Sequence, residues 1–174
     1  MRRLGLKFSD GNLIAYGEVF TFEGCVIALG NFDGIHLGHQ KLLQYLLLHA
    51  EERRLANAVM LFDPHPVKFL QPDRDFLSIY SLEQKAQFLE QLGVKNLCIL
   101  EFDDSVAQLS PEDFVKLVLA HPILNTQHII TGYNFHFGRQ RVGDNKIIAS
   151  LAQKYDMEYS EIDCVRSSHF EVSS

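Results

Sequence analysis

Two histidines in a glycine-rich stretch are the side chains of this sequence best suited to chemistry. His36 and His39 are three residues apart, so on a helix they share a face, and Gly38 between them leaves that face open. Gly30 and Gly34 allow positive φ angles and a close approach of the backbone to a ligand. Imidazoles beside free backbone N–H groups favour an anion, and phosphate is the usual anion at a helix start. The stretch therefore predicts a phosphate-handling site.

The flanking residues place this stretch between a strand and a helix. Residues 25–29 are an apolar run, which indicates a buried strand. Residues 40–53 carry leucines at helical spacing, and we expect them to form the apolar face of a helix: Leu42, Leu43, Leu46 and Leu47. His36 and His39 are expected to lie off that face. The order is therefore strand, glycine-rich turn and helix.

Strands and helices alternate along the rest of the chain. Further strands are expected at residues 58–62, 97–102, 127–131 and 157–162, and further helices at residues 82–92, 111–121 and 145–155. Ser81 with Gln84 forms a capping box, and Ser110-Pro111 is a second strong helix start. Residues 1–23 are interpreted as an irregular lead-in, in which Asp10-Gly11-Asn12 is a turn signal between short extended pieces. Residues 67–80 are interpreted as a long loop. The alternation predicts an α/β domain whose parallel sheet has helices on both faces.

Two further loops carry unusual residues, and each follows a predicted strand. The first is Asp63-Pro64-His65-Pro66, where two prolines predict a rigid connection. The second runs from Gly132 to Arg139 and contains Tyr-Asn-Phe-His-Phe between glycines. Ligands of parallel sheets bind outside the carboxyl ends of the strands, so these loops and the glycine-rich turn are expected to converge on one edge.

Composition narrows the class of protein. The chain has 174 residues, 47% of them hydrophobic, which suits one globular domain. A net charge of −6 argues against nucleic acid or an anionic membrane as a main partner. No apolar run approaches the length of a membrane span. Cys25, Cys98 and Cys164 match no metal or disulfide spacing, which favours free thiols and a cytoplasmic location.

The motifs resemble those of one enzyme family. His-x-Gly-His resembles the signature of the nucleotidylyltransferase superfamily, and Gly-Asn-Phe-Asp-Gly-Ile-His-Leu-Gly-His-Gln resembles the FMN adenylyltransferase module of bacterial FAD synthetases. Pro64-His65-Pro66 and the run from Gly132 to Gly138 are similar to further motifs of that family. The resemblance covers residues 1–174 as one domain and implies a Rossmann-like, doubly wound sheet of about five strands.

The resemblance also implies the reaction and its cofactor. FMN and ATP would give FAD and pyrophosphate, the FMN phosphate attacking the α-phosphorus of ATP directly without an enzyme nucleophile. Catalysis would then rest on positioning and charge stabilisation, with Mg²⁺ neutralising the departing pyrophosphate.

The site residues that the resemblance implies fall into three groups. His36 and His39 would be catalytic. The nucleotide would contact the turn and the chain end, at Gly30, Asn31, Phe32, Asp33, Gly34, Gly38, Ser173 and Ser174. The flavin would contact the other two loops, at Pro64, His65, Pro66, Asn134, Phe135, Phe137 and Arg139. No residue is assigned to a protein-bound metal.

The end of the sequence departs from the family pattern. The family carries Ser-Ser-Thr/Ser-x-x-Arg after the fifth strand, whereas this sequence ends at Ser173-Ser174 without the arginine. We expect the riboflavin kinase domain that follows in the family to be absent from this chain as well. We expect a fragment of a bifunctional parent, in which that domain lies in cis, and we expect the fragment to bind its ligands but to turn over slowly.

Other functions remain open at the level of sequence. One is a nucleotidylyltransferase for pantetheine phosphate or nicotinate mononucleotide, although the Phe-rich segment and Pro64-His65-Pro66 favour flavin. Another is a flavin- or nucleotide-binding protein without catalysis. A third is a zinc site made from His36, His39 and His65. The sequence argues against zinc, because no cysteine or third ligand lies at a usual spacing.

Overall fold

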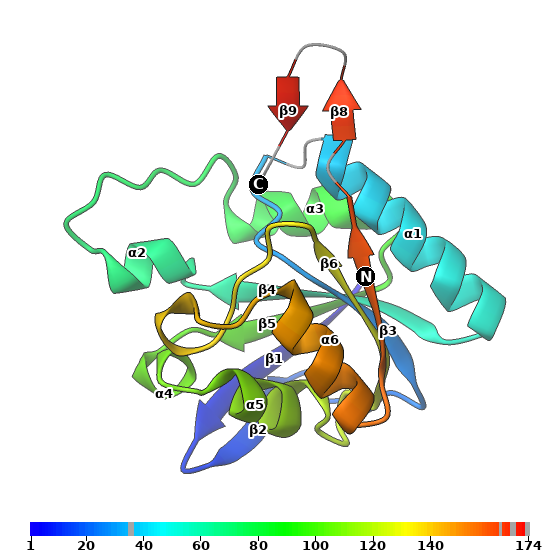
Figure 1. The fold of residues 1–174 in the computed structure, drawn as a ribbon, viewed down its shortest axis with the longest axis horizontal. Coiled ribbons are helices and arrows are strands. Elements are labelled where there is room, and N and C mark those ends of the chain that lie inside the picture. The colour runs from blue at the N-terminus through cyan, green and yellow to red at the C-terminus, as the bar shows by residue number, and fades with distance from the viewer. Residues whose placement is uncertain (35–36, 164, 168–169, 173–174) are drawn as a thin grey trace.

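A computed structural model describes residues 1–34, 37–163, 165–167 and 170–172 of the chain. Seven strands form one sheet in the order β2-β1-β5-β4-β3-β6-β7 (Figure 1). These are β1 (Arg2–Ser9), β2 (Asn12–Gly17), β3 (Cys25–Leu29), β4 (Ala56–Asp63), β5 (Asn96–Glu101), β6 (Thr126–Gly132) and β7 (Glu158–Ile162). Two short strands, β8 (Val165–Ser167) and β9 (Phe170–Val172), pair with each other in a separate antiparallel hairpin.

Helices connect most of the strands. They are α1 (Leu37–Arg53), α2 (Pro66–Leu70), α3 (Leu82–Gln91), α4 (Asp104–Ala107), α5 (Pro111–Asp113) and α6 (Asn145–Lys154). A π-helix, Phe114–Leu119, continues directly from α5, and a short 3₁₀-helix spans Arg139–Arg141. The capping box of Ser81 and the cap by Ser110 before Pro111 both form, which confirms these two helix starts.

The strand order contains a switch point. From β3 the chain adds β4 and β5 on one side, and it then crosses back to add β6 and β7 on the other side. All of these neighbours pair in parallel. In a doubly wound sheet the ligand crevice lies at the carboxyl ends of the strands where the order reverses, here between β3 and β6.

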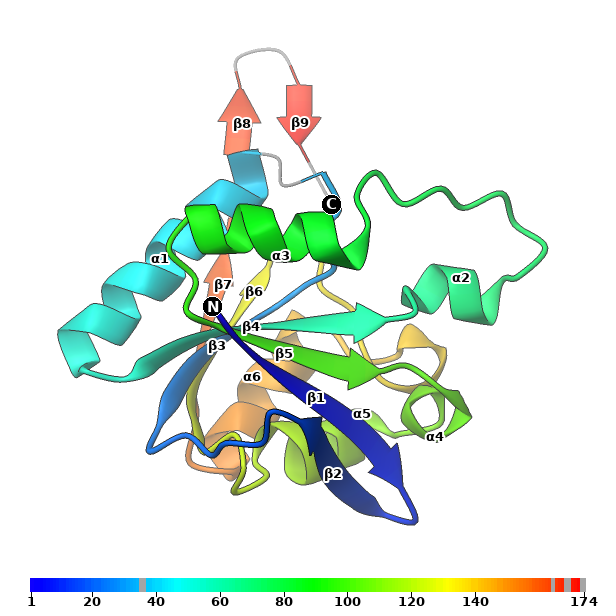
Figure 2. The ribbon, with the colours of Figure 1, turned by 180° about the vertical axis from the view of Figure 1, so that it is seen from behind.

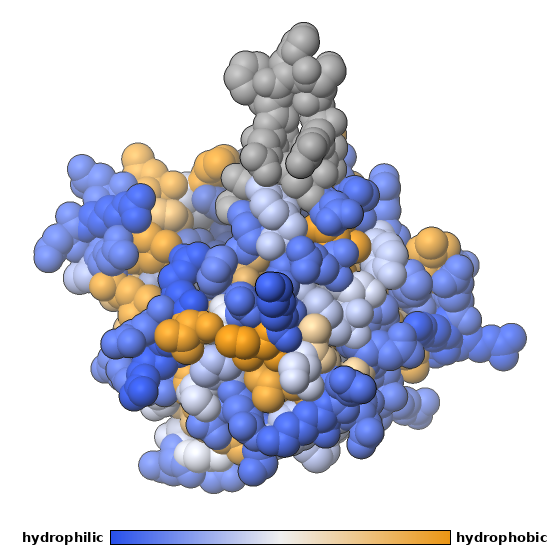
Figure 3. Space-filling view, viewed as in Figure 1, coloured by the Kyte–Doolittle hydropathy of each residue, from blue (hydrophilic) through white to orange (hydrophobic). Residues whose placement is uncertain are grey.

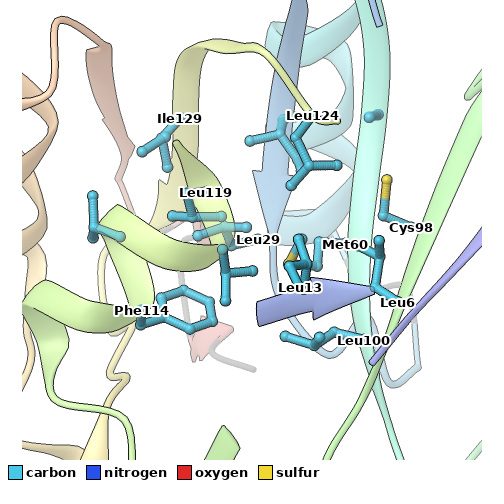
Figure 4. Packing of buried hydrophobic residues seen from close by; sticks show 14 of the residues in the cluster. Leu6, Leu13, Leu29, Met60, Cys98, Leu100, Phe114, Leu119, Leu124 and Ile129 are labelled. Atoms are coloured by element: carbon cyan, nitrogen blue, oxygen red, sulfur yellow. The ribbon is translucent and has the colours of Figure 1, made fainter. Parts of the chain in front are cut away.

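Helices cover both faces of the sheet, as predicted. Along β3, Cys25, Ile27 and Leu29 belong to one hydrophobic cluster, while Val26 and Ala28 belong to another. The first cluster packs against the π-helix and α6, and the second against α1 and α3 (Figure 2). Figure 4 shows the first cluster, in which Phe114 and Leu119 of the π-helix face Leu29 of the sheet. Both faces of β3 are buried, which explains its unbroken apolar sequence.

The expected number of strands was too low, because the first residues are not an irregular lead-in. They form a hairpin whose first strand pairs in parallel with β5 and whose second strand is antiparallel. Leu4, Leu6 and Phe8 alternate with less buried residues and fill the core, and Asp10 and Gly11 make the turn at positive φ. The sheet is thus mixed at this edge, while the Rossmann-like class stands.

The segment after β4 also differs from the expectation of a long loop. Pro66 occupies the first position of α2, where its missing N–H is not needed, and His65 caps the helix. Only the residues beyond Leu70 run without regular structure to Ser81.

Two of the three cysteines lie in the described residues. Cys25 and Cys98 are buried and free, and burial raises the pKa of the Cys25 thiol to about 12. Cys164 lies outside the described residues. None of the helices described is long and apolar enough to cross a membrane.

Candidate active site

The structure brings the three unusual loops to one edge of the sheet. Leu29, the last residue of β3, pairs with Met60 of β4 on one side and with Thr131 of β6 on the other. Gly30 and Gly132 therefore emerge side by side at the switch point, and the loop of Pro64 follows the adjacent strand. This edge is also where the geometry of doubly wound sheets places a ligand.

His39 lies in α1, but its position corrects our expectation that it faces away from the apolar side. Its side chain is 5% exposed, and its ring lies 4.8 Å from the ring of Phe32. The buried positions of α1 are His39, Leu42, Leu43, Leu46 and Ala50, so the histidine continues the leucine stripe by one turn. His36, the other predicted catalytic residue, lies outside the described residues.

Phe32 anchors the glycine-rich turn. Its side chain is fully buried, and its φ of 49° is an unusual conformation for an aromatic residue. Gly30 lies against its ring, because a Cβ added to Gly30 would be 3.0 Å from Phe32 Cε2. Asn31 and Gly34 are partly exposed on the same turn, and Gly38 is partly exposed in the first turn of α1. Phe32 thus packs the turn against the core, while Asn31, Gly34 and Gly38 keep part of their surface exposed.

Asp33 is engaged by the segment before α3. Its carboxylate accepts hydrogen bonds from Ser78 Oγ at 2.8 Å, Ile79 N at 3.1 Å and Tyr80 N at 3.3 Å. Lys85 Nζ lies 3.4 Å away. Partial burial alone would raise the pKa of the Asp33 carboxyl, but these hydrogen bonds and the lysine hold it below its usual range. Asp33 therefore ties the turn to the 71–80 segment.

His65 has a structural role in the second loop. Its Nδ1 accepts a hydrogen bond from Val67 N at 3.2 Å, which places the proton of the neutral ring on Nε2. The ring stacks on Phe76 at 4.3 Å. Burial, and then the charge of Lys85, lower its pKa, while Asp33 opposes them. The ring is therefore a neutral imidazole that can donate a hydrogen bond from Nε2, and the partly exposed Pro64 and Pro66 flank it.

The 71–80 segment connects these two loops, because Phe76 contacts His65 while Ser78 to Tyr80 bind Asp33. It also carries exposed hydrophobic side chains, with Leu77 90% and Ile79 67% exposed. In Figure 3 hydrophobic surface is visible on the side of the molecule that α2 and this segment occupy. The segment therefore forms an apolar rim beside the turn.

The aromatic loop after β6 is folded onto the core. Phe137 is buried and packs on Phe114 with 5.7 Å between ring centroids, while Phe135 stacks on Phe137 at 5.6 Å and stays half-buried. Phe137 and Gly143 exchange backbone hydrogen bonds of 3.1 and 2.9 Å. Phe137 thus packs against Phe135 from the core side, while Phe135 and Asn134 stay partly exposed.

Arg139, Ser173 and Ser174 complete the predicted set. Arg139 is exposed in the 3₁₀-helix, and its backbone N donates to Leu109 O at 2.7 Å. Ser173 and Ser174 lie outside the described residues.

Sequence reasoning missed two supports of the site. Lys85 is 7% exposed on the buried side of α3, and a lysine among Ala86 and Leu89 is a sequence signal for a buried ionic partner. Gly138 presses against Pro111, since an added Cβ would lie 2.9 Å from the Pro111 nitrogen. Nothing in the sequence shows that contact, because it depends on two segments that meet only in the fold.

A surface hollow of about 530 Å³ lies elsewhere, between Ala120, Asn125 and Tyr155. It borders Thr126, at the amino end of β6, whereas the three loops lie at the carboxyl end. We therefore place the site at the loops. Among the described residues, no group of three or more His, Cys, Asp or Glu side chains is arranged to hold a metal ion.

Comparison with known proteins decides the family. The sequence profile of FAD synthetase matches residues 20–174. The chain belongs to the FAD synthetase family. The bifunctional riboflavin kinase/FMN adenylyltransferase of Escherichia coli K12 is 37% identical over 138 residues, 79% of this chain and 42% of that protein. The FAD synthetase of Listeria monocytogenes is 31% identical over 153 residues, 87% of this chain and 61% of that protein.

The chain therefore spans between about two fifths and three fifths of the length of these two FAD synthetase relatives. Among solved structures, a protein described as a macrolide-efflux protein from Streptococcus pneumoniae matches with a TM-score of 0.78 at 25% identity, over 98% of this chain and 54% of that one. A pantothenate synthetase from Thermus thermophilus matches with a TM-score of 0.50 at 16% identity, which shows a shared fold alone.

Proposed function

We propose that this domain transfers the adenylyl group of ATP to FMN, which gives FAD and pyrophosphate. Membership of the FAD synthetase family supports the proposal, and the names of the relatives specify FMN adenylyltransferase. The observation that carries it is the pairing of Leu29 with Thr131, which sets the glycine-rich turn beside the aromatic loop at the switch point. A nucleotide phosphate site and a flavin site would thus share one crevice.

In this proposal the nucleotide lies at the turn. Backbone N–H groups near the start of α1 would bind the ATP phosphates, and His36 and His39 would stabilise negative charge at the reacting phosphorus. Phe32 would fix the orientation of the His39 ring, which it contacts. Since the FMN phosphate attacks directly, the protein supplies positioning rather than a nucleophile.

The flavin lies at the other two loops. Phe135 offers a half-buried aromatic face, and Asn134 can donate and accept hydrogen bonds toward a ring edge. His65 would present Nε2–H, while Arg139 would face phosphate. Phe137 would act indirectly, because its ring is buried beneath Phe135.

Magnesium would enter with ATP. Mg²⁺ is usually held by substrate phosphates and one or two carboxylates, and it would neutralise the departing pyrophosphate. Asp63, exposed at the end of β4, is a carboxylate of this edge. The relatives' names also join riboflavin kinase to FMN adenylyltransferase, so we propose that a kinase domain of the parent protein supplies the FMN.

The test is a comparison of acceptor substrates. Pyrophosphate release from ATP is measured with FMN, with 4′-phosphopantetheine and with nicotinate mononucleotide, each with Mg²⁺. Release that depends on FMN, together with FAD formation, is the expected result. Release with another acceptor alone would make the domain a different nucleotidylyltransferase, and FMN binding without release would make it a binding domain.

A further inference from the structure

The first residue of α6 closes the turn that begins the aromatic loop. Asn145 Nδ2 donates to the carbonyl oxygens of Gly132 at 3.0 Å and of Tyr133 at 2.9 Å. Its Oδ1 lies 3.4 Å from Thr131 Oγ1, which donates to it. One amide side chain thus binds three successive residues at the end of β6.

A second layer holds Thr131 in place. Thr131 is fully buried, and its Oγ1 shares a hydrogen bond of 2.8 Å with the hydroxyl of Tyr159 on β7. Burial raises the pKa of Tyr159 to about 12, against the opposing effect of its hydrogen bond with Thr131. The tyrosine is therefore a neutral hydroxyl at physiological pH, and the chain of contacts runs from β7 through β6 to α6.

The chemistry of the contact requires an amide. Two carbonyl oxygens need two N–H donors on one group, and the oxygen of the same group must accept from Thr131. An aspartate of the same shape carries no donor when ionised and would place its charge against two carbonyl oxygens. An alanine would leave the carbonyls without this partner.

We propose that Asn145 is a positioning residue for FMN, an inference that rests on the proposed function. It fixes the turn at Gly132 and Tyr133, which directly precedes Asn134 and Phe135, and in this role it touches neither substrate. A fixed turn lowers the entropic cost of ordering the loop when FMN binds. Loosening it therefore weakens FMN binding and leaves ATP binding unchanged.

The experiment compares Asn145→Asp with Gln153→Glu in the full chain. Gln153 is exposed in the last turn of α6, so its variant adds the same charge to the same helix away from the loop. Loss of two hydrogen bonds should raise the KM for FMN about tenfold. The KM for ATP should change less than about twofold, because the turn after β3 is untouched. Gln153→Glu should behave as wild type.

A second measurement follows the loop directly. Hydrogen exchange of the amides of residues 133–137 should be faster in Asn145→Asp than in wild type and Gln153→Glu, without any ligand. If Asn145→Asp does not fold, Asn145→Ala serves for both measurements, since it removes the donors without adding a repulsive charge.

The outcomes separate the two claims. If wild type binds FMN and the KM for FMN is unchanged in the Asn145 variant, or only the amount of active protein falls, the positioning role is wrong and the proposed function stands. If wild type binds no FMN, the proposed function fails. Unchanged exchange in residues 133–137 would then overturn the structural role of Asn145 on its own.

Discussion

The ring of His39 belongs both to the proposed phosphate site and to the packing of α1. It extends the buried stripe of the helix and lies against Phe32, whose ring is itself fully buried. A change at His39 therefore acts on the turn and on the fold together. Rate measurements on His39 variants can therefore be interpreted only when the free energy of unfolding of the same variants is measured as well.

We predict that His39→Ala lowers the free energy of unfolding by about 1–3 kcal/mol, because it removes a buried ring that packs on Phe32. Urea unfolding measures this loss. His39→Gln, which keeps more of the volume, should lose less. A His39→Ala protein as stable as wild type would contradict the buried position of the ring.

His36→Ala is predicted to lower the adenylylation rate about 10²-fold, as for loss of a charge stabiliser.

At the scale of elements, the aromatic loop is positioned by the segment that leads into α5. Gly138, at a φ of 72°, leaves no room for a Cβ beside Pro111, and Arg139 N donates to Leu109 O at 2.7 Å. The loop is thus fixed at its far end by α5 and at its near end by Asn145 of α6. The position of the half-buried Phe135 depends on both.

We predict that Gly138→Ala is more destabilising than Gly11→Ala. Both glycines have positive φ, 72° and 78°, but an added Cβ at Gly11 meets no heavy atom within 4 Å. Gly11→Ala should therefore cost about 1 kcal/mol for the backbone conformation alone. Gly138→Ala should cost about 1–3 kcal/mol more, for the clash with Pro111. Chemical unfolding of the two variants decides, and equal losses would contradict this contact.

The elements that sequence predicts well are those with local signals. β3 was predicted at its observed bounds, because burial of both faces leaves an unbroken apolar run. Ser81 and Ser110 are caps whose geometry is local. At the N-terminus the sequence indicates the turn at Asp10-Gly11 between extended pieces, but not that these pieces are regular strands of the sheet. Gly5 interrupts the pattern in the middle of β1, where it lies beneath the ring of Tyr16 that only the fold supplies.

The candidate site also has parts that local sequence signals predict and parts that depend on the fold. The glycine-rich turn and the aromatic loop are visible as motifs, and their convergence follows from the alternation of strands and helices. The contacts that hold them are not visible. Asp33 meets Lys85, and Asn145 meets the carbonyls of Gly132 and Tyr133, only because the chain folds distant segments together.

At the scale of the whole molecule, α1 packs against β6 at a buried histidine. His128 of β6 is 1% exposed, shares a hydrogen bond of 2.9 Å with Ser160 Oγ, and faces the ring of His49 at 5.6 Å. Burial, and then the charge of Arg53, lower its pKa to about 4, while Glu158 opposes them.

This pKa predicts how stability depends on pH. An unfolded histidine titrates at about 6.5, so between there and the folded value the unfolded chain binds more protons. The stabilisation is complete above the unfolded pKa and is lost as the pH falls toward about 4. Through this residue, the free energy of unfolding should be about 1–2 kcal/mol lower at pH 5 than at pH 7. His128→Gln should reduce the difference, and an unreduced difference would assign it to other groups.

The central claim, that the crevice between β3 and β6 joins AMP to FMN, is tested most directly by the fate of each ATP phosphorus. The domain is incubated with FMN, Mg²⁺ and ATP labelled with ³²P at either the α or the γ position. The account predicts that the α label appears in FAD and the γ label in pyrophosphate, and that neither product forms without FMN. A γ label on the flavin, or ATP cleavage that ignores FMN, would contradict it.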